Sequence, residues 1–164
     1  MIYRPHPRSG VVDPAYGDAN ARIVAALAAA NAADPAAQHV HDTGPDLGWQ
    51  LAAADLAVVD ISAMVYDRLA AGKPLLISRP VDPEALVDDT GYLADAEWLD
   101  ADSADDIVAR TDRVLGDPDA VARLDHWVRY YFGDTAPGAS TERFHAAVRT
   151  LMDRWESWDA GVPA

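Results

Sequence analysis

The chain has 164 residues, a length that suits one ordinary domain whose core needs no disulfide or metal to hold it. Thirteen Lys and Arg residues stand against 27 Asp and Glu residues, and the net charge of −14 makes nucleic-acid binding by the whole surface unfavourable. There is no cysteine, which excludes thiolate chemistry, and no apolar run of the ~20 residues that a membrane span needs. We therefore expect a soluble, cytoplasmic protein.

The first third of the chain is expected to alternate strand and helix. Residues 1–4 resemble the end of a strand, which Pro5 and Pro7 would stop. A helix follows over residues 19–33, with an uncertain start near Asp13-Pro14 because Gly17 interrupts the pattern. Residues 38–41 form a weak strand candidate, and Asp46 can cap a short helix. Because a domain seldom begins on a strand of this kind, we expect the C-terminal part of a longer protein.

The clearest pattern lies between Leu51 and Ile77. Residues 56–59 are a short apolar run that predicts a strand buried on both faces. Ser62 can cap a helix that Gly72 ends, and residues 75–77 form a second apolar run. The pattern predicts a βαβ unit with parallel strands.

The remainder is expected to be mostly helical after a loop over residues 78–89. Two short extended pieces at 91–93 and 97–99 precede a helix whose capping box would be Ser103 and Asp106. A further helix runs from 119 to 131, and Ser140 or Thr141 caps a last helix that reaches Trp155. The aromatic residues of these two helices are most simply explained by helix–helix packing: Trp127, Tyr130, Tyr131, Phe132, Trp155 and Trp158.

Alternating strands and helices predict an α/β fold with a doubly wound parallel, Rossmann-like sheet over residues 1–164. The βα turns of such a sheet lie at one edge, so residues 4–10, 60–63 and 133–141 can converge there. No metal-ligand spacing is present, and no G-x-G-x-x-G, Walker A or G-x-S-x-G motif occurs, so no cofactor is expected.

Each candidate side chain has an ordinary structural interpretation beside a functional one. Arg4, His6 and Arg8 form a local basic island that could hold a phosphate, although His6 can also be a plain turn residue. Ser62 is a helix cap or a phosphate ligand beside a helix N-terminus. Asp60 can bond a ribose hydroxyl or only loop amides. The remaining candidates divide between ligand contacts and simple surface or capping roles: Arg79, Ser140 and Thr141.

These stretches together resemble the C-terminal half of the CDP-glycerol glycerophosphotransferase family, whose members polymerise teichoic-acid-type glycerol phosphate. The similarity covers about residues 2–149: Arg4-Pro5-His6-Pro7, then AADLAVVDISAMVYDRLAAGKPLLI, then FGDTAPGASTERF. The family's Asp-Tyr-Ser-Ser motif aligns with Asp60-Ile61-Ser62-Ala63, in which one tyrosine and one serine are replaced. Its C-terminal Gly-x-Ser/Thr region aligns with Gly138 to Thr141.

The resemblance implies the donor-binding half of a GT-B fold. His6 would contact the donor pyrophosphate, with further donor contacts from the Ser62 turn and from residues 138–141. The intact enzyme would move glycerol phosphate, or a related polyol phosphate, from a CDP-linked donor to a polyol-phosphate or glycan acceptor, and release CMP. It would act in the cytoplasm, at the inner face of the cell membrane, through membrane contacts outside this chain.

Three alternatives remain open at this point. The chain can be half of a nucleotide-sugar GT-B glycosyltransferase or epimerase, which a uridine preference would indicate. It can be a non-catalytic nucleotide- or partner-binding module, which the replaced serine at Ala63 favours. A phosphoacceptor receiver domain is the weakest alternative, because no acidic pair follows the first strand.

Overall fold

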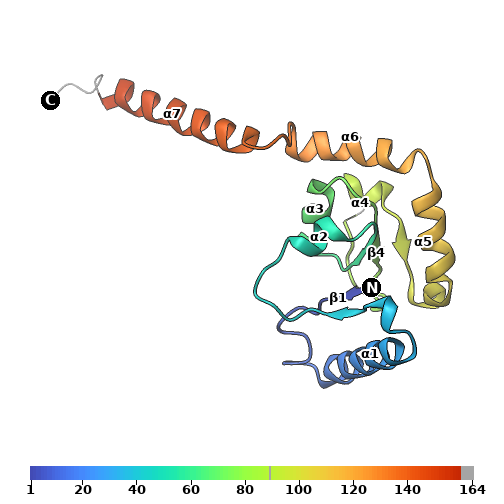
Figure 1. Cartoon of the computed structure of the whole chain (residues 1–164). Coiled ribbons are helices and arrows are strands. Elements are labelled where there is room, and N and C mark those ends of the chain that lie inside the picture. Colours follow the sequence, from blue (N-terminus) through green and yellow to red (C-terminus); the bar gives the residue numbers. More distant parts are fainter. Residues whose placement is uncertain (89, 160–164) are drawn as a thin grey trace. The chain divides into compact units, whose positions relative to one another are not determined.

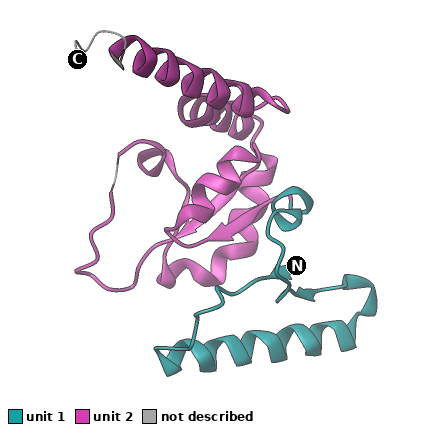
Figure 2. Cartoon of the chain, turned by 90° about the vertical axis from the view of Figure 1, so that its left-hand side faces the viewer, with its two compact units in different colours: residues 1–54 teal, residues 55–164 magenta. Residues whose placement is uncertain are grey.

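A computed structural model describes residues 1–88 and 90–159 of the chain (Figure 1). The chain, for which one domain was expected, divides into two compact units, Met1–Ala54 and Asp55–Ala164 (Figure 2). Asp89, at the end of the expected loop, and residues 160–164 of the expected domain lie outside the described residues.

Unit 1 is built on two short parallel strands. Strand β1 (Ile2–Tyr3) pairs with β2 (Val40–His41), and helix α1 (Pro14–Ala33) connects them. The Asp13 carboxylate accepts a hydrogen bond from the Ala15 amide, so the expected cap is confirmed and Gly17 lies inside the helix. A 3₁₀ turn, η1 (Pro35–Ala37), precedes β2.

The short helix α2 (Trp49–Ala53) ends unit 1, and it begins later than expected. Gly48 occupies its N-cap, so the prediction that Asp46 caps this helix was wrong. The Asp46 carbonyl instead accepts a hydrogen bond from the Gln50 side chain, which holds the preceding turn against the helix.

Unit 2 contains a three-stranded parallel sheet in the order β3 (Ala57–Val59), β4 (Leu75–Ser78) and β5 (Trp98–Leu99). Val58 lies opposite Leu76 in β4, and Ile77 lies opposite Trp98 in β5. Helix α3 (Ala63–Ala70) makes the crossover between β3 and β4, with Ser62 at its N-cap. The predicted βαβ unit is confirmed.

The core of unit 2 lies between this sheet and its helices. It comprises Val65, Leu69, Leu75, Ile77, Tyr92, Leu93 and Leu124. The central strand β4 is buried on both faces, whereas Val58 of β3 is 49% exposed, so the expected double burial of β3 was wrong. Side chains alternate along a strand, so Ala57 and Val59 pack against the core and Val58 points away from it.

Of the two extended pieces expected after β4, the one at 97–99 is confirmed as β5, and the one at 91–93 is not. Residues 92–95 form a helical turn, α4 (Tyr92–Asp95), in place of the strand predicted at 91–93. Both Tyr92 and Leu93 are buried in the core. Consecutive side chains in a strand point to opposite faces, so a helical turn is the conformation that buries both on one side.

The helix after β5 also starts differently. A 3₁₀ segment, η2 (Ala101–Asp106), leads into α5 (Ile107–Gly116). The Ser103 hydroxyl donates to the Asp100 carbonyl, and Asp106 at the N-cap of α5 makes no side-chain capping bond. The predicted capping box was therefore wrong, because its serine closes the preceding turn.

Helices α6 (Ala120–Phe132) and α7 (Ala139–Asp159) are the last described elements, and their aromatic residues differ in burial. Trp127 and Phe132 of α6 pack against the core, whereas Tyr130 is 69% exposed, so the expected packing holds for only part of this helix. Trp155 and Trp158 of α7 contact each other with ring centroids 5.5 Å apart and remain mostly exposed, so the expected packing of α7 was wrong.

The observed class is α/β with parallel strands, in line with the prediction at that level. The described strands form two sheets, so the single doubly wound sheet is not confirmed. Among the described helices, none has the length and apolar character needed to cross a membrane.

Candidate functional site

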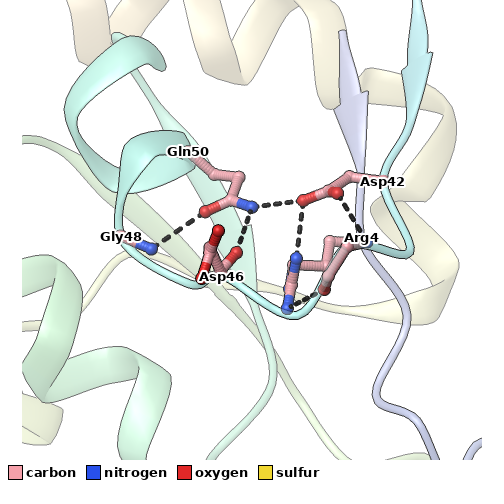
Figure 3. Close-up of polar contacts among 6 residues, drawn as sticks. Arg4, Asp42, Asp46, Gly48 and Gln50 are labelled. Atoms are coloured by element: carbon pink, nitrogen blue, oxygen red, sulfur yellow. Dashed lines mark hydrogen bonds and ion pairs between the residues drawn. The ribbon is translucent and has the colours of Figure 1, made fainter.

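Arg4, a candidate phosphate ligand, is held inside a polar network in unit 1 (Figure 3). Its guanidinium donates to the Asp42 carboxylate at 2.6 Å and to the Gly44 carbonyl at 2.9 Å. Gln50 is buried, and its side-chain NH₂ group donates to the same Asp42 carboxylate. Its side-chain oxygen accepts a hydrogen bond from the Gly48 amide at 3.0 Å. Arg4 therefore joins the end of β1 to the turn between β2 and α2.

The network also stabilises the ionised form of Asp42. The Gly44 amide, the Gln50 side chain and the Arg4 guanidinium all lower the pKa of this carboxyl group below its usual value. Neither Asp42 nor Gln50 was predicted from the sequence. The available signal was position, because Asp42 directly follows the weak strand candidate at residues 38–41.

His6 lies on the exposed loop that follows β1. Its Nδ1 accepts a hydrogen bond from the Arg8 amide at 3.1 Å, so Nδ1 carries no proton in this conformation. The neutral ring then has its proton on Nε2. The Ser9 amide donates to the His6 carbonyl at 2.8 Å and closes the turn. His6 can therefore donate a hydrogen bond to a ligand from Nε2.

The His6 loop is fixed to helix α1 by a contact between two glycines. Gly10 has φ +82°, and a Cβ built on it would lie 2.6 Å from the Gly17 Cα. Only glycine allows both this backbone conformation and this approach. Gly17, which obscured the helix start in the sequence, is the residue of α1 whose backbone this contact reaches.

Arg8 is the cation that stays available beside His6. Its side chain is exposed, and no hydrogen bond or ion pair of its guanidinium occurs within residues 1–88 and 90–159. A guanidinium can bind phosphate through two parallel N–H groups. His6 and Arg8 together offer donors to an anion, while the neighbouring N-terminus of α1 is already occupied by the Asp13 carboxylate.

The second set of candidate residues gathers at the carboxyl edge of the sheet in unit 2. The Ser62 hydroxyl donates to Asp60 Oδ1 at 2.7 Å and accepts from the Met64 amide at 3.3 Å. Its proton is thus directed to Asp60 and not toward a ligand. The Asp60 carboxylate is exposed and would repel a phosphate, but it can accept hydrogen bonds from hydroxyl groups.

Arg79 follows β4 at the same edge. It forms an ion pair with Asp100 at 3.0 Å and lies over the Trp98 ring, 4.4 Å from the centroid. Both charged side chains are about half exposed, so the pair is of the weak surface kind. Asp100 and Trp98 were not predicted as neighbours of Arg79, although Trp98 lies in a strand parallel to β4 and Asp100 directly follows that strand.

Residues 138–141 form the start of α7 and make no hydrogen bond, ion pair or ring contact with Asp60, Ser62 or Arg79 among the described residues. The helix begins at Ala139, which places Gly138, with φ +88°, at the N-cap. Ser140 and Thr141 lie within the first turn and are exposed, so the prediction that either caps the helix was wrong. A residue that the sequence did not indicate, Arg143, holds this turn by donating to the Asp134 and Phe132 carbonyls at 2.9 Å.

The described part of unit 2 has a small cavity away from these residues. It has a volume of about 40 Å³ and lies against Pro74 and Glu97, which precede β4 and β5 at the amino edge of the sheet. Small-molecule sites usually enclose ~300–1,000 Å³. This cavity suits a water molecule and not a nucleotide. No group of acidic and histidine side chains that could hold a metal occurs among the described residues.

Comparisons with known proteins add nothing to the class that the fold defines, which is an α/β protein with parallel strands. No family model, no curated protein and no solved structure matches this chain.

Proposed function

We propose that this chain is the donor-binding half of a glycerophosphotransferase of the GT-B type. In this proposal its strands belong to a doubly wound sheet, since the orders β1-β2 and β3-β4-β5 both occur in a sheet that runs 2-1-3-4-5. The observation that carries the proposal is the His6 loop, which follows the first parallel strand. It holds a defined ring tautomer and the Arg8 guanidinium, which has no hydrogen bond or ion pair among the described residues.

The reaction transfers a glycerol phosphate group. An acceptor hydroxyl oxygen forms a bond to the phosphorus that bears glycerol, and the bond from this phosphorus to the CMP oxygen breaks. CMP leaves with the electron pair, and the hydroxyl proton passes to a base that the resemblance assigns to the other half of such enzymes. The Nε2–H of His6 and the Arg8 guanidinium would stabilise negative charge on the departing CMP. The Asp60 carboxylate would accept a hydrogen bond from a ribose or glycerol hydroxyl.

Titration calorimetry with CDP-glycerol, CMP and UMP tests the proposal. We expect cytidine-selective binding that weakens by about 1–3 kcal/mol in His6→Ala, the scale of a hydrogen bond to a charged group. His126→Ala is the matched control, because His126 is exposed on α6 and should leave binding unchanged. Uridine-selective binding would indicate a nucleotide-sugar enzyme instead. Measurable transferase turnover by this chain would contradict its assignment as a donor-binding half.

A non-catalytic binding module is the second candidate, and two observations favour it. Arg4 is occupied by Asp42 and Gly44, and the Ser62 hydroxyl is occupied by Asp60. Two of the phosphate contacts predicted from the sequence would therefore need rearrangement before binding. If no nucleotide binds at millimolar concentration, this candidate replaces the transferase half.

A further inference from the structure

Helix α7 carries an apolar stripe with the spacing of a coiled-coil seam. Phe144, Val148, Leu151, Trp155 and Trp158 follow one another at intervals of four, three, four and three residues. This alternation places all five side chains on one side of the helix, as in the a and d positions of a heptad repeat. Four of the five are between 63% and 66% exposed, and Val148 is half-buried.

Such a stripe needs a partner, because an isolated surface rarely exposes three large rings and a leucine in one row. Two-thirds of the roughly 150–250 Å² that each aromatic side chain can bury gives about 300–500 Å² for the three rings. Leu151 and the adjacent Met152, which is 56% exposed, extend this area. The total is below the ~800 Å² per partner of a standard stable interface, which indicates a weak, concentration-dependent association.

The charges of α7 favour a second copy of the same helix. Through Trp158 the helix has three arginines and three acidic residues, in a chain whose net charge is −14. Glu142 with Arg143 and Arg149 makes the first half net positive, and Asp153 and Glu156 with Arg154 make the second half net negative. Two copies in opposite directions therefore place unlike halves together, and their helix dipoles also oppose each other favourably.

We propose that the chain forms a homodimer through antiparallel pairing of α7 with α7 of a second copy. In the register where a positions face d positions, Phe144 packs against Trp155 of the other copy, and Val148 packs against Leu151. The arrangement is self-complementary about a two-fold axis, so it closes as a dimer and does not propagate.

Sedimentation of the chain over about 10–500 μM tests the association, a range that spans micromolar affinity. We expect a monomer–dimer equilibrium that Leu151→Asp weakens by at least ~10-fold, because the charge enters the apolar seam. Ala146→Asp is the matched control, since it adds the same charge on the opposite side of α7 and should leave the equilibrium unchanged. Circular dichroism of both variants checks that the helix is retained.

Cross-linking tests the direction of pairing, and the absence of native cysteine makes it specific. An oxidised mixture of Phe144→Cys and Trp155→Cys chains should form disulfides between the two variants, while Phe144→Cys alone should not. A disulfide in Phe144→Cys alone would overturn the antiparallel arrangement. A chain that stays monomeric over the whole concentration range, or a dimer that Leu151→Asp does not weaken, would overturn the proposal.

Discussion

The contact between Gly10 and Gly17 predicts opposite effects for the same substitution at two positions. Gly10→Ala should destabilise unit 1 by about 2–5 kcal/mol. About 1–2 kcal/mol comes from an L-residue in the left-handed conformation, since φ is +82°. A further ~1–3 kcal/mol comes from overpacking, because the new Cβ would lie 2.6 Å from a backbone atom that no rotamer change can move.

Gly17→Ala should instead stabilise unit 1. Gly17 lies within α1, and a Cβ there would lie 3.7 Å from the Gly10 Cα and carbonyl oxygen, an ordinary contact distance. Alanine in a helix interior is favoured over glycine by about 0.5–1 kcal/mol. The pair of variants therefore tests whether glycine is needed at position 10, where the backbone is left-handed and crowded, and not at position 17, where it is neither.

Hydrogen exchange of the α1 amides provides the assay, because it reports opening at individual amides of unit 1. The free energy of opening should fall in Gly10→Ala and rise in Gly17→Ala. Donor binding should weaken only in Gly10→Ala, since Gly10 positions the loop that carries His6. Equal effects of the two substitutions would show that the glycine contact does not hold the loop on the helix.

Two further predictions concern Asp42 in the polar network of unit 1 and Ser62 at the N-cap of α3. Asp42 has a lowered pKa in the folded chain, so its contribution to stability is fully present above its unfolded pKa of about 3.8 and is lost as the pH falls through the lower folded pKa. Hydrogen exchange of unit 1 amides gives the difference in opening free energy between wild type and Asp42→Asn. This difference should be constant above pH ~4 and shrink below it. A constant difference down to pH ~2 would show that the Arg4, Gln50 and Gly44 contacts do not stabilise the ionised Asp42. Ser62→Ala should lower the urea unfolding free energy of unit 2 by about 1 kcal/mol through loss of the cap on Met64. Ser103→Ala should cost under ~0.5 kcal/mol, because the Ser103 hydroxyl bonds only the Asp100 carbonyl among the described residues. Equal losses in these two variants would show that Ser62 has no special capping role.

The local elements followed closely from the sequence where one physical cause dominates. The apolar runs at 56–59 and 75–77, separated by an eight-residue amphipathic helix and a glycine, gave the predicted βαβ unit, whose strands are 57–59 and 75–78. Caps with the right side chain at the right place, Asp13 and Ser62, were also predicted, because their hydrogen bonds involve residues two positions away. Such contacts are encoded within a short stretch and need no knowledge of the remaining chain.

What the sequence did not indicate depends on contacts between distant residues. The helical turn at Tyr92 arises because two consecutive side chains must reach one core, and the partners of Arg4 lie about forty positions along the chain, at Asp42 and Gly44. The sequence alone determined which residues carry charge, hydroxyl groups and imidazole at the ends of strands. Only the tertiary structure decided that the Arg4 guanidinium is already paired within the protein, while His6 and Arg8 keep donors for a ligand. The physical reason is that hydrogen-bond pairing depends on distance in space, which residue type and spacing along the chain do not specify.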